Sequence, residues 1–246
     1  MLPKKSLLAL DGFNIMYRAF HGNEKLTGPG GHPTGAIHGF LKTVRMLEKI
    51  LPDHRIVVTL DPFPAGHRAP AGNQRLMELA DLGDTGLSRH DLYPGYKGTR
   101  SEMPDDMKVQ LIPLVLILQG LGYSVLQGNA YAEADDLLAS LATLAMSRGE
   151  PVVIGSGDKD TFKLVKDGYC RVFSPNTNTM IEEKDVIAKF GVSPEKMEDF
   201  LALMGDAVDN IPGVKSCGEK TAAKWLNKYN DLDGIIQNAH LIKGVV

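Results

Sequence analysis

The chain has 246 residues, of which 43% are hydrophobic, and this length suits one large domain or one domain with an appendage. Its 27 Lys and Arg residues are balanced by 30 Asp and Glu residues, so the formal charge of −3 excludes an overall basic protein. We find no run of about 18 apolar residues and no leader pattern, and therefore expect neither a membrane span nor a secretory signal. The two distant cysteines, Cys170 and Cys217, indicate small apolar fillers in a reduced, cytoplasmic protein.

Short apolar strands and amphipathic helices alternate along most of the chain. Strands are predicted over residues 6–11, 55–61, 124–126, 151–155 and 170–173, and helices over residues 36–50, 108–121 and 134–148. Residues 62–88 interrupt the pattern with Gly, Ala, Pro and mixed charge, which indicates an excursion from the sheet. Further helices are predicted over residues 184–190, 194–204, 219–228 and 232–238. This order predicts an α/β fold, a three-layer sandwich with a mainly parallel central sheet, followed by a helical segment.

Seven carboxylates stand at or just past the ends of these strands and at the start of one helix. They are Asp11, Asp61, Glu133, Asp135, Asp136, Asp158 and Asp160. A single Asp in such a place is equally well explained as a helix cap or a turn residue, but the same pattern recurs in four segments. Because parallel sheets bind ligands at the carboxyl ends of their strands, we expect the acids to converge on one edge.

So many like charges in one place destabilise the fold by several kcal/mol unless cations neutralise them. No His or Cys lies among the acids, and ligation by oxygen alone favours Mg²⁺ or Mn²⁺ over zinc or copper. Two such ions about 4 Å apart are the usual device for phosphodiester cleavage, in which one activates water and the other stabilises the leaving oxygen. The sequence therefore predicts a two-metal site, whose ions would also reverse the local charge.

Two further acids, Asp206 and Asp209, follow the predicted helix 194–204. On a helix end, their spacing of three residues places them on one face, which suits joint ligation of one ion. The alternative is a solvated helix C-terminus, although two acids there would oppose the helix dipole.

Two glycines, Gly213 and Gly218, flank a predicted tight hairpin that leads directly into the helix at residue 219. Backbone amides at such a turn and helix start form an anion site. The side chains that can add contacts to phosphate are those of Lys215, Lys220 and Thr221. The segment is not a Walker loop, because Glu219 separates the glycine from the lysine. An ordinary helix-turn-helix is the alternative.

Residues 89–100 combine cations with two tyrosines, Tyr93 and Tyr96. Aromatic rings that stack on bases, beside cations that hold phosphates, are typical of sites for single-stranded nucleic acid. A solvated loop would explain the same composition.

Together, and over nearly the whole chain, these segments resemble the 5′ nuclease family, which includes the N-terminal domain of bacterial DNA polymerase I, stand-alone 5′ exonucleases and flap endonucleases. The resemblance rests on Asp11-Gly12 with Asn14 and Tyr17-Arg18, His32-Pro33-Thr34-Gly35, residues 93–100, Glu133-Ala134-Asp135-Asp136, Gly157-Asp158-Lys159-Asp160, and residues 200–212. The segment between Asp61 and Arg89 is longer than is usual in the family. Tyr131, Ser216 and Cys217 stand where the family usually has Gly, Gly and Val or Ile.

The resemblance implies a PIN-like nuclease core over residues 1–180, with an arch or gateway at about 62–110. It implies a helical DNA-binding segment over residues 181–246, with a helix-hairpin-helix variant at about 195–230 that holds duplex phosphates and a K⁺ ion. One metal ion would be held by Asp11, Asp61, Glu133, Asp135 and Asp136, and the other by Asp158, Asp160, Asp206 and Asp209. Catalytic roles in the arch are implied for Arg89, Lys97 and Arg100, with Lys97 positioning the scissile phosphate. DNA contacts are implied for Arg18, Tyr93, Tyr96, Gly213, Val214, Lys215, Gly218, Lys220 and Thr221.

The predicted function is hydrolysis of DNA at 5′ ends or 5′ flaps by a structure-specific 5′-3′ exonuclease or flap endonuclease that uses two Mg²⁺ or Mn²⁺ ions. We expect a monomer with no membrane association, whose partners are such DNA and a fused or separate DNA polymerase. One alternative is a flap-binding module with weak catalysis, caused by the altered arch or a truncated chain. Another is an RNA-processing nuclease of the PIN type, which the helix-hairpin-helix disfavours.

Overall fold

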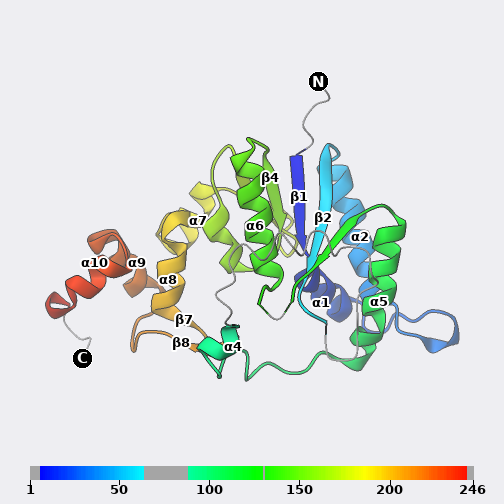
Figure 1. Ribbon diagram of the computed structural model, residues 1–246, viewed down its shortest axis with the longest axis horizontal. Helices are drawn as coiled ribbons and strands as arrows, with labels where there is room; N and C mark the ends of the chain where they lie inside the picture. The colour runs from blue at the N-terminus through cyan, green and yellow to red at the C-terminus, as the bar shows by residue number, and fades with distance from the viewer. Residues whose placement is uncertain (1–5, 64–87, 130, 243–246) are drawn as a thin grey trace.

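The computed structural model describes residues 6–63, 88–129 and 131–242, and its centre is a six-stranded sheet in the order β3-β2-β1-β4-β5-β6 (Figure 1). The strands are β1 (Ser6–Asp11), β2 (His54–Leu60), β3 (Ser124–Gln127), β4 (Val152–Gly155), β5 (Cys170–Ser174) and β6 (Thr179–Ile181). The first five run parallel to their neighbours, and β6 pairs antiparallel with β5. The mainly parallel sheet is therefore confirmed, and β6 is an addition that the sequence pattern did not predict.

Both faces of the sheet are buried, which explains why its strands read as continuous apolar runs. Along β1, Leu8 and Leu10 enter one core, whereas Leu7 and Ala9 enter the other. The first core is closed by α1 (Gly12–Gly22), α2 (Gly35–Ile50) and α5 (Asp105–Gly120). The second core is closed by α6 (Ala134–Ser147), the 3-10 helix η3 (Lys159–Leu164) and the helices of the C-terminal segment. These layers form the expected three-layer sandwich.

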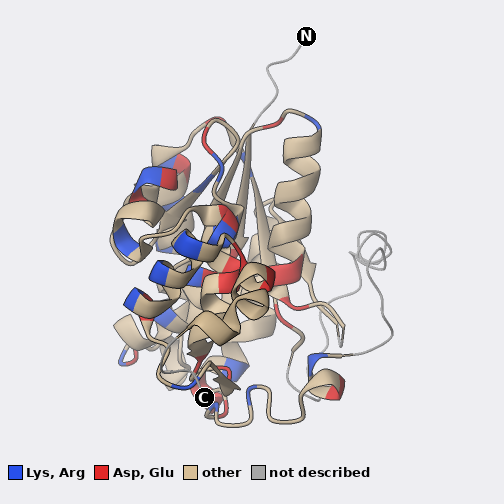
Figure 2. Cartoon of the chain, turned by 90° about the vertical axis from the view of Figure 1, so that its left-hand side faces the viewer, with Lys and Arg blue, Asp and Glu red and all other residues tan. Residues whose placement is uncertain are grey.

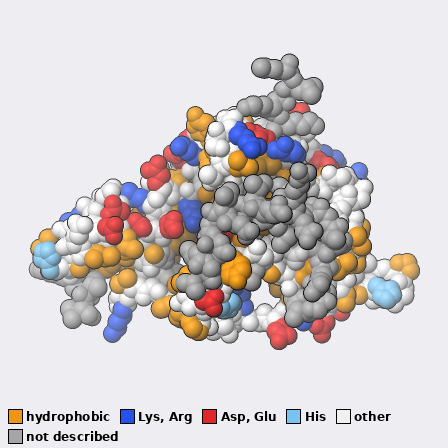
Figure 3. All heavy atoms as spheres, in the orientation of Figure 1, with side chains coloured by type: hydrophobic (Ala, Val, Ile, Leu, Met, Phe, Trp, Pro, Cys, Tyr) orange, Lys and Arg blue, Asp and Glu red, His pale blue; other side chains and the backbone are white. Residues whose placement is uncertain are grey.

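The C-terminal segment extends the second core sideways as an arm on the left of Figure 1. Its helices are α7 (Glu183–Phe190), α8 (Met197–Met204), α9 (Glu219–Tyr229) and α10 (Leu232–Gln237). Short 3-10 turns lie at η4 (Pro194–Lys196) and η5 (Ala239–Leu241), and η1 (Pro29–Gly31) lies between α1 and α2. Hydrophobic side chains remain on the surface of this arm (Figure 3), including Ile236 and Leu241, which are 63% and 60% exposed.

A two-stranded hairpin connects α8 to the rest of the arm. It consists of β7 (Gly205–Asp206) and β8 (Ile211–Pro212), and in Figure 1 it lies beside the short helix α4 (Arg89–Leu92) at the bottom of the molecule. The carboxyl ends of the parallel strands point to this same edge. The hairpin, α4 and the strand ends therefore surround one region, although they are distant in sequence.

The structure can be compared with three further expectations about local structure. Helix α1 was not predicted, since the sequence analysis assigned no element between the strand at residues 6–11 and the helix at residues 36–50. The expected excursion at residues 62–88 lies almost wholly outside the described residues. Among the described residues, no helix combines the length and the apolar character that crossing a bilayer requires.

Candidate active site

Asp11 and Asp61 are placed by the ends of the two central strands. Asp11 is the last residue of β1 and caps α1, since its Oδ1 accepts a hydrogen bond from the Asn14 amide at 3.0 Å. Its Oδ2 accepts one from the Ser156 hydroxyl at 2.9 Å, and the residue is only 7% exposed. Asp61 follows β2 and accepts a hydrogen bond from the Ala134 amide at 2.8 Å. Each acid is thus fixed by the first turn of a helix.

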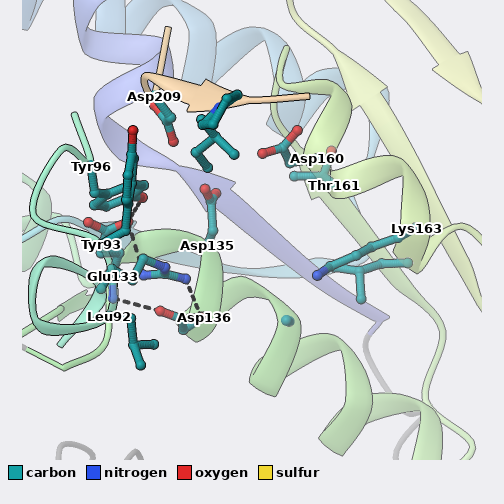
Figure 4. Close-up of a pocket in the computed structure, with 15 residues that line it drawn as sticks. Leu92, Tyr93, Tyr96, Glu133, Asp135, Asp136, Asp160, Thr161, Lys163 and Asp209 are labelled. Carbon is teal, nitrogen blue, oxygen red and sulfur yellow. Dashed lines mark hydrogen bonds and ion pairs between the residues drawn. The ribbon is translucent and has the colours of Figure 1, made fainter. Parts of the chain in front are cut away.

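Helix α6 begins with the acidic motif, as predicted. Glu133 is the N-cap residue, and its amide donates to Asp136 Oδ2 at 2.9 Å. Asp135 lies between them and points into the cavity toward Asp160 and Asp209 (Figure 4). The same close-up shows Glu133 and Asp136 on the opposite side of the cavity, where both contact cations.

The third group of acids follows β4. Asp158 caps η3 by accepting a hydrogen bond from the Asp160 amide at 3.0 Å, and its own amide donates to the Ser156 hydroxyl at 3.1 Å. The Gly157 amide donates to Asn14 Oδ1 at 3.0 Å, which ties this turn to α1. Asp160 Oδ1 is buried without a hydrogen-bond partner among the described residues.

Asp206 and Asp209 do not lie on a helix end, so that expectation is wrong. Helix α8 stops at Met204, because Gly205 takes a left-handed conformation with a φ of 71°. Asp206 lies in β7, where its Oδ1 accepts from the Val208 amide at 2.8 Å, and Asp209 lies in the turn that follows. Both acids nevertheless line one cleft, as predicted, but the β7–β8 hairpin holds them together and not a helix face.

Seven acids from five segments of the chain line one cleft of about 730 Å³. They are Asp11, Asp61, Asp135, Asp158, Asp160, Asp206 and Asp209. The predicted arch residues Lys97 and Arg100 also line this cleft. An adjoining hollow of about 560 Å³ shares three of the acids and is lined in addition by Glu133, Asp136 and Arg89. All nine predicted metal ligands therefore lie around two adjoining cavities.

Several acids in the cleft are destabilised in their charged form. Burial, together with the charges of Asp11 and Asp158, raises the pKa of Asp135 to about 7. Burial also raises the pKa of Asp11 to about 6, against hydrogen bonds from Asn14 and Ser156, and that of Asp160 to about 6, with repulsion from Asp158. Such shifts are expected where carboxylates are gathered for a ligand rather than for packing.

The other acids are held by cations of the protein itself. Glu133 Oε2 lies 2.8 Å from Lys97 Nζ and 3.0 Å from Arg89 Nη1, and Asp136 Oδ1 lies 2.8 Å from Arg89 Nη2. The remaining pairs are Arg100 with Asp209, and Lys159 with Asp206 at 3.2 Å. Although burial alone would raise the pKa of Asp206, the hydrogen bonds from Lys159 and the Val208 amide lower it.

The donor set fits hard divalent cations. It contains only carboxylate oxygens, one of which has no partner among the described residues, and its raised pKa values reflect charge that a cation would neutralise. In the described part of the chain, no three His, Cys, Asp or Glu side chains stand in positions that could hold one metal ion. This agrees with the ion pairs, which turn Glu133, Asp136, Asp206 and Asp209 toward Lys and Arg.

Residues 93–100, which belong to the predicted arch, lie beside the cleft. The Tyr96 hydroxyl donates to Glu133 Oε2 at 2.9 Å, the residue is 7% exposed, and burial followed by the Glu133 charge raises the pKa of this phenol. Lys97 Nζ lies 5.0 Å from the centre of the Tyr96 ring. Tyr93, by contrast, is exposed. Of the two tyrosines, Tyr93 is therefore the one with a free surface for stacking on a base.

The predicted hairpin at residues 213–221 is present between β8 and α9. The Cys217 amide donates to the Val214 carbonyl at 2.9 Å, and Gly218 precedes the first residue of α9. Lys215 and Lys220 are exposed, and Thr221 is half-buried. Figure 2 shows Lys and Arg spread over the helices of this arm, with acidic residues toward the centre of the view.

Arg18 occupies a different environment from the other predicted DNA contacts. Its guanidinium donates to the Pro175 carbonyl and, at 3.2 Å, to the Thr43 hydroxyl. It thereby ties α1 to α2 and to the turn after β5. The sequence analysis did not predict a site role for Asn14, Ser156, Lys159 or Asn210, although all but Ser156 stand in the motifs that carry the family resemblance. Their roles depend on contacts between distant segments, for which a single sequence carries no pattern.

Comparison with known proteins places these features in a family. The N-terminal resolvase-like domain of 5′-3′ exonucleases matches residues 6–191, and the C-terminal SAM fold of 5′-3′ exonucleases matches residues 192–245. A 5′-3′ exonuclease of Aquifex aeolicus is 37% identical over 234 residues, which are 95% of this chain and 73% of that protein. A DNA polymerase I of Pseudomonas aeruginosa is 40% identical over 221 residues, which are 90% of this chain and 22% of the polymerase.

Solved structures share the fold. A bacteriophage T5 flap endonuclease in a complex with DNA and metal ions superposes with a TM-score of 0.71 at 20% identity, over 97% of this chain and 80% of that chain. The chain spans about a fifth of the length of the DNA polymerase I relative. Since the family models together cover almost all of the described residues, the chain belongs to the 5′-3′ exonuclease family.

Proposed function

We propose that this chain is a structure-specific 5′ nuclease that hydrolyses DNA phosphodiesters at 5′ ends or 5′ flaps with two Mg²⁺ or Mn²⁺ ions. The observation that carries this proposal is the convergence of seven carboxylates, from five segments, on one cleft at the carboxyl edge of the sheet. Because these acids raise one another's pKa, their gathering costs stability and is best explained by a cationic ligand. Membership of the 5′-3′ exonuclease family supports this proposal.

The metal ions would be held by two sets of acids. Asp11, Asp61, Glu133, Asp135 and Asp136 would serve one ion, and Asp158, Asp160, Asp206 and Asp209 the other. When bound, the ions would supply Lewis-acid polarisation of the phosphate and a lowered pKa for the attacking water. The Arg and Lys residues that now pair with four of these acids would then be free to contact phosphate oxygens.

Lys97 and Arg100 would bind the phosphate that reacts. Both line the acidic cleft, and the side chain of Lys97 is 19% exposed and held between Glu133 and the Tyr96 ring. A fixed ammonium at this position would attract the substrate phosphate and stabilise the charge that builds up on it during hydrolysis. Arg89 lines the adjoining hollow, where it would hold Glu133 and Asp136 in place.

The rest of the DNA would be held outside the cleft. The hairpin at residues 213–221, with Lys215, Lys220 and Thr221, would bind duplex phosphates and a K⁺ ion through its backbone groups. Tyr93 would stack on a base of the single strand. A fused or separate DNA polymerase is the proposed partner, and the protein would act as a monomer in the cytoplasm. The division into a core over 1–180 and a binding segment over 181–246 belongs to the same proposal.

The test is cleavage of a 5′-flap duplex labelled at the flap, in Mg²⁺, in Mn²⁺ and in EDTA. We expect cutting near the junction in either metal, none in EDTA, and none with the double variant Asp158→Ala/Asp160→Ala. Asp53→Ala is the matched control, because Asp53 is an exposed acid in the turn before β2. Tight flap binding without cutting in either metal would overturn the proposal and favour the flap-binding module.

A further inference from the structure

Three contacts join the predicted arch segment, residues 93–100, to the turn between β7 and β8. The Lys97 amide donates to the Asp209 carbonyl at 2.9 Å, and Asn210 Nδ2 donates to the Gly95 carbonyl at 2.8 Å. The Arg100 guanidinium pairs with the Asp209 carboxylate. The two segments are more than a hundred residues apart in sequence, so tertiary contacts such as these set the distance between them.

The backbone at this junction is strained on both sides. Lys97 has a φ of 54° and Asn210 a φ of 58°, a region that residues with a Cβ rarely adopt. Asn tolerates this conformation better than most residues, whereas Lys has no such preference. Lys97 therefore keeps it only because its surroundings hold it there. The residue held in this way lines the acidic cleft, and its ammonium lies 2.8 Å from Glu133 Oε2 in the adjoining hollow.

Resting on the proposed nuclease function, we propose that Asn210 is a positioning residue for Lys97. The Asn210 amide fixes the carbonyl of Gly95, two residues before Lys97, while the neighbouring Asp209 carbonyl fixes the amide of Lys97 itself. The turn that carries Asn210 continues through β8 directly into the hairpin at residues 213–221. Asn210 thus links the segment that would hold the duplex to the lysine that would contact the scissile phosphate.

Two variants isolate this amide from the strained backbone. Asn210→Gly removes the donor and tolerates the positive φ, and Asn210→Asp keeps the shape but places a carboxylate against the Gly95 carbonyl. We expect both to lower kcat for flap cleavage by about tenfold and to leave KM within about twofold, because misplacement of a reacting group affects the chemical step. Asn23→Ala is the matched control, since Asn23 Nδ2 makes an equally long bond of 2.8 Å to the Ala19 carbonyl in a part of the fold that has no proposed role in catalysis or DNA binding, and we expect it to match the wild type.

A double-mutant cycle decides whether Asn210 acts through Lys97. If it does, adding Asn210→Gly to Lys97→Ala causes no further loss of kcat. A full additional tenfold loss in the Lys97→Ala background would overturn the proposal, as would an unchanged kcat in Asn210→Gly alone.

A second readout does not depend on cleavage. Because the Lys97 amide is hydrogen-bonded to the Asp209 carbonyl, deuterium exchange in a peptide covering residues 93–100 should quicken in Asn210→Gly and stay at the wild-type rate in Asn23→Ala. Equal exchange in all three proteins would overturn the link even if the wild type cuts DNA. If the wild type does not cut, the nuclease proposal fails, and the exchange result reports separately on the link.

Discussion

At the scale of single residues, two aspartates of one cleft have pKa values that are shifted in opposite directions. Burial and the neighbouring acids raise the pKa of Asp135 to about 7, whereas hydrogen bonds from Lys159 and the Val208 amide lower the pKa of Asp206 despite its burial. Asp135 is thus poised for a cation from outside, and Asp206 already has one from the protein. The pKa of each acid therefore reports whether a cation of the protein lies beside it.

The pH dependence of stability tests this difference. The pKa of Asp135 rises from 3.8 to about 7 on folding, so between those values the folded state holds a proton that the unfolded state releases. Its contribution to stability is therefore full below about pH 4 and is lost as the pH rises through about 7. We expect Asp135→Asn, measured by denaturant unfolding in EDTA, to be more stable than the wild type by on the order of 2 kcal/mol at pH 7.5 and equal to it at low pH.

Asp206→Asn is the contrasting variant for that measurement. Because the folded-state pKa of Asp206 is lowered, its contribution is present above the unfolded pKa and lost as the pH falls. The variant should be less stable than the wild type at pH 7.5. If Mg²⁺ is then added, the wild type should gain stability over Asp135→Asn, since the ion binds only the folded site. A wild type that stays more stable than Asp135→Asn in EDTA at pH 7.5 would contradict the raised pKa.

Sequence alone located the acids but not the groups that hold them. Asp and Glu in recurring positions at strand ends are visible as a pattern, and all nine predicted metal ligands do lie around the two cavities. Ser156 and Asn14 were missed because their function is a hydrogen bond to a distant segment. Arg18 illustrates the converse, since a cation in a motif proved to be bonded to the Pro175 carbonyl and Thr43.

At the scale of elements, periodicity predicted the long strands and helices well, and it failed where a short segment or a glycine controls the backbone. Strand β6 has three residues, which is too few for an alternating pattern to emerge. The end of α8 at residue 204 was predicted, but the next residues were assigned to the same helix face. Gly205 instead turns the chain into β7 and brings it against Gly213, so the position of both acids depends on this one backbone conformation.

Substitution of Gly205 tests how rigid the β7–β8 hairpin is. A Cβ on Gly205 would lie 2.2 Å from the Gly213 amide nitrogen and 2.5 Å from the Ile211 carbonyl oxygen, and its φ is positive. We expect Gly205→Ala to lower the free energy of unfolding by about 1–2 kcal/mol of backbone strain plus about 1–3 kcal/mol of overpacking. Gly191→Ala is the control, because Gly191 has a φ of 73° but its Cβ would meet only Ala223 Cβ at 3.4 Å. Gly191 has a ψ of 11°, in the αL region that Ala tolerates better than the ψ of 179° at Gly205, so this variant should lose only about 1 kcal/mol in the same urea titration. Equal losses in the two variants would show that neither the close approach nor the backbone conformation at Gly205 is rigid.

At the scale of the whole molecule, the net charge of −3 conceals a separation of charge. The acids are gathered around the cleft, and the exposed lysines Lys215 and Lys220 stand on the hairpin that leads into α9. Under the proposed function, such a local basic surface would attract DNA, while the acidic cleft would repel phosphate until cations occupied it. The total charge therefore predicts the solubility of the chain better than it predicts its partners.

The salt dependence of DNA binding measures this local surface directly. Each phosphate neutralised by Lys or Arg contributes about −0.9 to the slope of log K against log salt on duplex DNA. In the Asp158→Ala/Asp160→Ala background, which prevents cutting, we expect the further changes Lys215→Ala and Lys220→Ala to make the slope shallower by about 0.9 each. Lys49→Ala serves as the control, because Lys49 lies in the last turn of α2, next to the start of β2 at the opposite edge of the sheet. If all three lysines changed the slope alike, the hairpin would hold no particular phosphates, and DNA would be attracted by diffuse charge instead.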